Sequence, residues 1–219
     1  MNTLILIPAR KGSVRLKNKN KKNFLGKPLV FHSIQFAKKI KILKKILIST
    51  DDPKILLIGK KFKVLAPWLR PKEISTSKSK SISFAFHALK WVEKNYKEPD
   101  TIILLQPTSP FRSINTLKGM LKLYRKNKKS VVTVTTKLRK NKKILYFLNN
   151  KFLKKEKKLN DKNVQAVNIV GNTYINSVKN LKKYRDFVNK ETIPYLITNS
   201  KELVDIDTPK DFNKAIKLS

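Results

Sequence analysis

Uninterrupted apolar runs that alternate with helical patterns constrain this chain more than any other feature of its sequence. Residues 4–7 and 102–105 are apolar throughout, which is typical of parallel strands covered on both faces. Around these runs, apolar residues recur with the spacing of amphipathic helices. A parallel sheet with helices on its two faces buries both patterns. We therefore predict an α/β fold, a three-layer α/β/α sandwich around a mostly parallel sheet.

The apolar runs and the helical spacing predict where the strands and helices lie. The strands are expected at residues 3–8, 45–49, 63–65, 101–105, 130–135, 143–148 and 172–175. The helices are expected at residues 29–40, 53–61, 82–95, 114–126, 178–184 and 208–218. At 219 residues we predict one domain, 1–219.

The segment 137–164 departs from this pattern. It is rich in Lys and Asn, with apolar patches at 146–148 and 152–153. We interpret it as a small insertion, either a flexible lid or a hairpin that packs on a second subunit. Because a monomer would struggle to bury the apolar residues, we expect the segment to mediate homodimerisation.

The formal net charge of +37 suggests a nucleic-acid partner, but the distribution of the charge argues against it. Only seven of the 51 basic residues are Arg, and the lysines are scattered over nearly every expected helix and loop. Such a bias is typical of a solvated surface shaped by genome composition. The chain has no cysteine and no apolar run of membrane-spanning length, so we expect a cytoplasmic protein without a membrane partner whose metal ligands are oxygen or nitrogen.

A basic loop follows the first expected strand. Arg10, Ser13, Lys19 and Asn20 lie in it around Gly12, with further basic residues between them. Ligands of open α/β sheets bind at the carboxyl ends of the strands, where cationic side chains and backbone N–H groups can surround a polyphosphate. The spacing fits neither a Walker loop nor the dinucleotide-binding glycine pattern. The alternative is a solvated turn.

A polar turn follows the strand at 101–105. Gln106, Thr108 and Ser109 offer uncharged donors and acceptors, and Pro107 and Pro110 fix the backbone. This composition suits recognition of a sugar or a base. The alternative is a rigid turn in which Ser109 or Ser113 caps the next helix.

Two carboxylates lie one residue apart near the end of the chain. In an extended segment Asp205 and Asp207 point to one face and Ile206 to the other, so that the pair offers oxygen ligands suited to Mg²⁺. Thr208 and Pro209 then start a helix. The alternative for Asp207 is the N-cap of that helix. His32 and His87 lie in helical patterns without an acidic partner at helix spacing, and we interpret both as structural.

Several motifs in consistent order along residues 3–217 together resemble the acylneuraminate cytidylyltransferase family. They read IPARKGSVRL at 7–16, KN at 19–20, GKPL at 26–29, STDD at 49–52, LRP at 69–71, LQPTSPFR at 105–112 and DIDT at 205–208. The resemblance implies a Rossmann-like nucleotide-binding sheet with a dimerisation insertion. It also implies transfer of CMP from CTP to the anomeric hydroxyl of an acidic nine-carbon 2-keto sugar, an N-acylneuraminate-like nonulosonic acid, with release of pyrophosphate.

The resemblance also implies roles for individual residues. Arg10, Ser13, Lys19 and Asn20 are expected at the triphosphate, Arg70 and Ser81 near the nucleotide, and Gln106, with Thr108 and Ser109 of the same turn, at the sugar. Asp205 and Asp207 are expected to bind Mg²⁺, and together with Arg10 and Lys19 they form the expected catalytic set. Basic groups and a metal suffice for in-line attack on phosphorus, so no protein nucleophile is expected.

Other functions stay open. Residues 168–171 read Asn-Ile-Val-Gly where family members usually carry Arg-Pro-Asn-Gly, a region that often presents a basic residue to the sugar carboxylate. The acceptor is therefore open between sialic, legionaminic and pseudaminic types, and GTP is an alternative to CTP. A CMP-KDO synthetase shares the opening loop but not the Gln-Pro-Thr-Ser-Pro turn. An RNA-binding protein is suggested by charge alone and has no use for the Asp pair.

Overall fold

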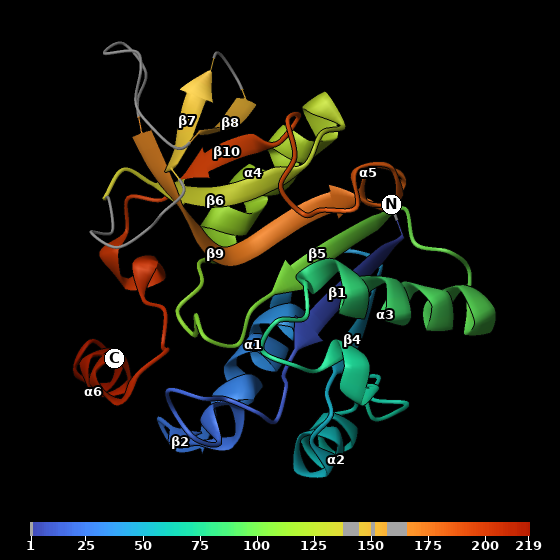
Figure 1. Ribbon diagram of the computed structural model, residues 1–219, viewed down its shortest axis with the longest axis vertical. Helices are drawn as coiled ribbons and strands as arrows, with labels where there is room; N and C mark the ends of the chain where they lie inside the picture. Colours follow the sequence, from blue (N-terminus) through green and yellow to red (C-terminus); the bar gives the residue numbers. More distant parts are fainter. Residues whose placement is uncertain (1, 138–144, 150–151, 157–165) are drawn as a thin grey trace.

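The computed structural model of the chain describes residues 2–137, 145–149, 152–156 and 166–219 (Figure 1). Its strands are β1 Thr3–Pro8, β2 Asn23–Phe24, β3 Lys27–Pro28, β4 Lys44–Ser49, β5 Thr101–Leu105, β6 Val131–Thr135, β7 Leu145–Asn149, β8 Phe152–Glu156, β9 Ala166–Ser177 and β10 Ile193–Leu196. Its α-helices are α1 Leu29–Lys39, α2 Pro53–Lys61, α3 Ser81–Asn95, α4 Ile114–Asn127, α5 Val178–Tyr184 and α6 Pro209–Lys217, joined by the 3₁₀ turns η1 Lys19–Lys21, η2 Lys72–Ile74 and η3 Ser200–Leu203.

One mixed sheet organises the fold. Its main path runs β10-β6-β9-β5-β1-β4, and β7 and β8 join it through β9. Strand β1 pairs in parallel with both β4 and β5, and β10 pairs in parallel with β6. The long strand β9 runs antiparallel between β5 and β6. The carboxyl ends of β1, β4 and β5 therefore meet at one edge, toward which the β1 and β5 arrows point in Figure 1.

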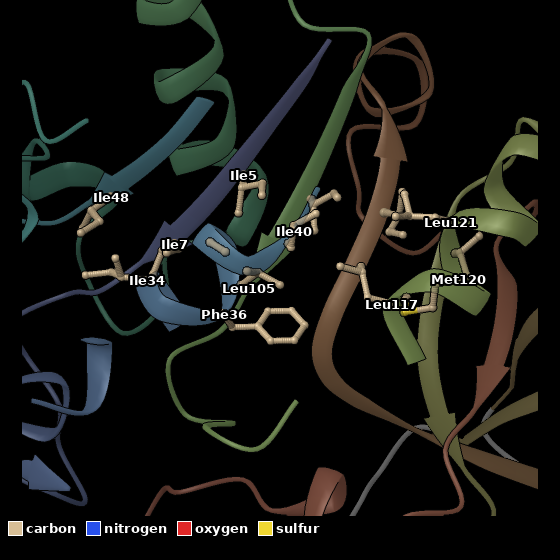
Figure 2. Close-up of a cluster of buried hydrophobic side chains, with 14 of the residues drawn as sticks. Ile5, Ile7, Ile34, Phe36, Ile40, Ile48, Leu105, Leu117, Met120 and Leu121 are labelled. Atoms are coloured by element: carbon tan, nitrogen blue, oxygen red, sulfur yellow. The ribbon is translucent and has the colours of Figure 1, made fainter. Parts of the chain in front are cut away.

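Helices cover both faces of the sheet, and this confirms the predicted three-layer α/β architecture. Ile5 and Ile7 of β1 pack with α1, α2 and α4 on one face, the cluster seen in Figure 2. Leu4 and Leu6 of the same strand pack with α3 and α5 on the other face. Strict alternation along a strand whose side chains are all apolar is what a doubly covered sheet requires. No helix in the described ranges is long and apolar enough to cross a membrane.

Three expected strands differ from the structure. At 63–65 the backbone forms only an isolated bridge, because Lys63 has a φ of 51° and breaks the extended run before Leu65 pairs with Leu47. The strand expected at 172–175 is the interior of the longer β9, and the one expected at 143–148 is β7. Strand β10 was not predicted; its Pro194 is tolerated because β10 lies at the sheet edge.

The hairpin interpretation of segment 137–164 agrees with the part that the structure describes. Strands β7 and β8 pair in antiparallel fashion, and β7 also pairs with the start of β9. The rest of the segment, residues 138–144, 150–151 and 157–165, lies outside the described residues. Its role as a dimerisation or lid element stays a prediction.

Candidate active site

A cleft of about 290 Å³ lies at the carboxyl ends of β1 and β5. Four segments far apart in the chain form its walls: the loop after β1, the stretch from residue 70 to α3, the turn after β5 and the extended segment before α6. The lining residues are Pro8, Arg10, Ser13, Val14, Arg15, Leu16, Lys19, Asn20, Arg70, Ile74, Thr76, Ser77, Ser79, Ser81, Phe84, Gln106, Pro107, Thr108, Asp205 and Asp207.

The loop after β1 is held by hydrogen bonds to the residues directly after β4 and to itself. The Thr50 hydroxyl donates to the carbonyl of Ala9 at 2.6 Å, and the Asn20 amide donates to the carbonyl of Arg10 at 3.0 Å. The backbone N–H of Lys11 donates to Asp51 at 2.8 Å. These bonds fix the loop backbone and leave the side chains of Arg10, Ser13 and Lys19 on the cleft wall.

Arg70 presents a second guanidinium group to the cleft. Its side chain is only 2% exposed, its Nε donates to Ser75 at 3.0 Å, and one terminal nitrogen lies 3.7 Å from Asp51. Burial lowers the pKa of Arg70, Asp51 opposes this effect, and the charge of Arg10 lowers the pKa further. Two guanidinium groups that repel each other across a cleft form a site suited to an anionic ligand.

The Asp205–Asp207 segment has the alternation expected from the sequence. Ile206 is fully buried in a small core with Phe24 and Phe212, while both carboxylates line the cleft. The N–H of Ile206 donates to the carbonyl of Thr108 at 2.7 Å, which ties the segment to the turn after β5. The buried isoleucine thus anchors a segment whose two acids face the cleft.

Thr208, not Asp207, caps α6. The Thr208 hydroxyl and the Asp211 carboxylate form a reciprocal capping box, and Pro209 occupies the first helical position. Asp207 instead pairs with two cations of the β1 loop: its carboxylate lies 2.6 Å from Arg15 and 2.7 Å from Lys19. These ion pairs hold the loop and the Asp segment together across the cleft.

Gln106 and Thr108 of the turn after β5 line the cleft, whereas Ser109 does not. Ser109 is 1% exposed and its N–H donates to the carbonyl of Gln106 at 3.2 Å, as in a tight turn. The cap of α4 is Ser113, one of the two serines that the structural alternative named. The placement therefore supports Gln106 and Thr108 as ligand contacts and gives Ser109 a place in the turn.

The structure thus gathers the other predicted site residues around one cleft: Arg10, Ser13, Lys19, Asn20, Arg70, Ser81, Gln106, Thr108, Asp205 and Asp207. It adds a wall that the sequence reasoning missed. Thr76, Ser77 and Ser79 contribute hydroxyl groups there, and Phe84 contributes a ring. The serine-rich run between Arg70 and α3 enters the same edge of the sheet as the basic loop, a placement that no motif of the sequence indicated.

Family and structural comparisons agree with this geometry. Residues 4–219 match the family model described as Cytidylyltransferase. The chain is 31% identical to CMP-N,N'-diacetyllegionaminic acid synthase of Legionella pneumophila, over 100% of this chain and 96% of that protein. It is 28% identical to a pseudaminic acid cytidylyltransferase of Campylobacter jejuni, over 98% and 95% of the two chains. An N-acylneuraminate cytidylyltransferase of Escherichia coli is 29% identical over 98% of this chain and 51% of that protein.

Solved structures show the same fold at low sequence identity. A CMP:2-keto-3-deoxy-manno-octonic acid synthetase complexed with CTP superposes with a TM-score of 0.73 at 18% identity, over 100% of this chain and 98% of that one. A putative glucose-1-phosphate thymidylyltransferase from Bacillus anthracis superposes with a TM-score of 0.69 at 13% identity, over 99% and 94%.

Proposed function

Because the chain belongs to the cytidylyltransferase family, we propose that its cleft transfers CMP from CTP to the anomeric hydroxyl of an acidic nine-carbon 2-keto sugar. The observation that carries the proposal is the composition of the cleft, in which Arg10, Arg15, Lys19 and Arg70 face the pair Asp205 and Asp207. Four cations suit a triphosphate, and two carboxylates suit a divalent cation. Gln106 and Thr108 offer uncharged contacts for the sugar.

The reaction requires no covalent intermediate on the protein. The anomeric oxygen attacks the α-phosphorus, an oxygen–phosphorus bond forms, and the bond from that phosphorus to the pyrophosphate group breaks. The hydroxyl proton passes to Asp205 or to solvent. Arg10, Lys19 and Arg70 offset the charge that builds on the phosphate oxygens, and Gln106 holds the sugar in line.

We propose Mg²⁺ as the cofactor of this site. The donor set fits a hard cation, since Asp205 and Asp207 lie on the same cleft wall. The two Asp207 oxygens pair with Arg15 and Lys19 in this structure and would turn to the metal once the phosphates take up those cations. The described residues contain no cluster of three or more metal-ligating side chains, so the remaining ligands would be phosphate oxygens and water, as is usual for Mg²⁺. When bound, the ion would neutralise phosphate charge. Arg15 and Lys19, which pair with Asp207, lie beside the expected position of the phosphates.

For the acceptor we propose a nonulosonic acid of the N-acylneuraminate type. The relatives are named for N,N'-diacetyllegionaminic, N-acylneuraminic and pseudaminic acids, which supports this class of acceptor and keeps the legionaminic and pseudaminic types as alternatives. A CMP-KDO synthetase remains the second candidate function, because such enzymes share the opening loop of this chain and a CMP:2-keto-3-deoxy-manno-octonic acid synthetase has the same fold.

Product analysis tests the proposal. The protein is incubated with CTP, Mg²⁺ and one acceptor at a time: N-acetylneuraminic, N,N'-diacetyllegionaminic, pseudaminic or 3-deoxy-manno-octulosonic acid. We expect pyrophosphate and a phosphodiester signal in phosphorus NMR with at least one nine-carbon acid. GTP in place of CTP tests the alternative nucleotide. A product with the eight-carbon acid alone would favour the second candidate. No product with any acid, together with tight salt-sensitive binding to mixed-sequence RNA, would favour an RNA-binding protein.

We further propose that the enzyme is a cytoplasmic homodimer and that segment 137–164 mediates its assembly. Support comes from the apolar residues of that segment, which lie in otherwise charged sequence. Sedimentation at micromolar concentration and moderate salt checks the assembly. A fully active monomer would contradict it and would favour the lid interpretation.

A further inference from the structure

Arg112 is a charged side chain close to the cleft that the proposed reaction does not use. It follows the turn after β5 by a few residues, and it is absent from the residues that line the cleft. Burial lowers the pKa of Arg112 to about 9, with Glu202 opposing, so the group is a cation at neutral pH. Burying a cation costs free energy unless hydrogen bonds or an opposite charge compensate, so the partners of Arg112 indicate its role.

The Arg112 guanidinium group connects three elements below the cleft. One terminal nitrogen donates to the carbonyl of Gln106 in the turn directly after β5, and the other donates to the hydroxyl of Ser33 on α1 at 3.1 Å. Its Nε donates to the carbonyl of Asn172 on β9 at 3.0 Å. A rigid planar fork with several N–H groups can reach all three acceptors at once, whereas a lysine ammonium cannot reproduce that geometry.

The contact on β9 lies at an irregularity of the strand. Pairing with β6 shifts between Val132 and Val134, and Gly171 has a φ of +78°. A Cβ at Gly171 would lie 2.9 Å from the Tyr174 hydroxyl and 3.9 Å from the Gln106 amide nitrogen. The bulge therefore brings the β9 backbone against the side chain of Gln106. Arg112 holds the carbonyls on both sides of this contact.

Asn172 extends the connection toward the Asp pair. Its side chain accepts a hydrogen bond from Thr133 at 2.8 Å and donates one to the carbonyl of Glu202 at 3.2 Å. The Glu202 carboxylate in turn accepts from the N–H of Ser113 and from the hydroxyl of Thr116 at the start of α4. The chain from Gln106 through Arg112 and Asn172 to Glu202 thus ends three residues before Asp205.

We propose that Arg112 is a positioning residue that sets Gln106, and through it the acceptor sugar, relative to the Asp205–Asp207 segment. The inference rests on the proposed function, because the sugar role of Gln106 is part of it. Arg112 does not touch the substrate. The second link to the Asp segment, from Ile206 to Thr108, is independent of Arg112, so nucleotide binding should survive its loss.

A double-mutant cycle tests the proposal. Arg112→Lys keeps the charge and removes the fork, Gln106→Ala removes the side chain that Arg112 positions, and the double variant measures their coupling. We expect Arg112→Lys to raise the acceptor KM on the order of tenfold, equivalent to about 1.4 kcal/mol, with the CTP KM within about twofold of wild type. In the Gln106→Ala background the same change should shift the acceptor KM less than about threefold. Arg125→Lys on the exposed face of α4 is the matched control.

A merely structural role predicts a different pattern. It would lower the fraction of folded enzyme and hence kcat, with both KM values unchanged, or it would give additive effects in the cycle; either result would overturn the proposal. If Arg112→Lys does not fold, Thr133→Val replaces it in the double-mutant cycle with Gln106→Ala. This variant removes the hydroxyl that donates to the Asn172 side chain.

Hydrogen exchange gives a readout that does not depend on activity. In Arg112→Lys we expect the amides of Leu105, Gln106, Thr108 and Ser109 to lose protection at least about tenfold while α2 is unchanged. Unchanged protection would overturn the positioning role. An inactive wild type would overturn the proposed function, whereas an active wild type with unchanged protection in Arg112→Lys would overturn the positioning role alone.

Discussion

At the scale of single residues, the few arginines carry more information than the many lysines. Arg10 and Arg70 face the same cleft, and the charge of one lowers the pKa of the other. A bidentate fork matches phosphate oxygens better than a lysine ammonium does. The chain could surround a triphosphate with lysines alone, yet arginines occupy these two positions.

Arg10→Lys is expected to weaken CTP binding on the order of tenfold, because it keeps the charge and removes the fork. The measurement is equilibrium titration with CTP, and Arg125→Lys serves again as the control for the exchange of Arg for Lys. Equal CTP affinity in wild type and Arg10→Lys would mean that the phosphates are held elsewhere.

His87 gives a pH dependence of stability. Its pKa is lowered by burial first and then by Arg70 and Lys90, and its ring packs on Trp68 at 4.4 Å between centroids. As pH falls below the ordinary histidine pKa of about 6.5, the unfolded chain takes up a proton that the folded chain resists, so stability is lost. We expect the urea midpoint to fall between pH 7 and pH 5, and His87→Gln to flatten that fall. A parallel pH profile in the variant would contradict the assignment.

At the scale of elements, capping fixes the segment that carries the acids. The capping box of Thr208 and Asp211 starts α6, whose Phe212 packs with Ile206. The position of the Asp pair therefore depends on a helix start that lies directly after it.

Thr208→Ala is expected to cost about 1 kcal/mol of stability, since it removes the hydroxyl that accepts from the Asp211 N–H. Urea unfolding measures the loss, and Thr198→Ala at an exposed position is the control. Equal midpoints for the two variants would show that the capping box contributes nothing to the fold.

Elements whose apolar residues recur with a clear helix or strand spacing were predictable from the sequence. Elements whose formation depends on tertiary contacts were not. Strand β1 and helix α4 follow from the apolar pattern and a serine cap. Strand β10 escaped prediction because Pro194 argues against a strand until its edge position is known. The same holds for the cleft: Arg10 and Asp207 stand in recognisable motifs, whereas Thr76 and Ser77 belong to it only because their loop enters the same edge of the sheet.

At the scale of the whole molecule, the charge of +37 surrounds a cleft whose two proposed substrates, CTP and an acidic sugar, are both anions. A strongly basic surface raises the encounter rate of anionic substrates, and salt screens this effect over about 10 Å at 0.1 M. Scattered surface lysines can thus assist capture without forming a nucleic-acid site.

We expect kcat/KM for CTP to fall several-fold, up to about tenfold, between 20 and 300 mM NaCl, with kcat nearly constant. Steady-state kinetics at saturating acceptor measures both constants. A kcat/KM that does not change with salt would show that the basic surface has no part in substrate capture.

The central claim is that this cleft catalyses the transfer through Asp207 and its cationic neighbours. Pyrophosphate release from CTP and the preferred acceptor, compared between wild type, Asp207→Asn and the exposed control Asp186→Asn, tests it most directly. We predict at least a hundredfold loss of activity for Asp207→Asn, about 2.7 kcal/mol in the barrier, and normal activity for Asp186→Asn. The unfolding midpoint of Asp207→Asn should stay close to that of wild type, because partly exposed ion pairs such as those of Asp207 contribute little to stability. Activity of Asp207→Asn within about tenfold of wild type, a barrier change of about 1.4 kcal/mol or less, would contradict it.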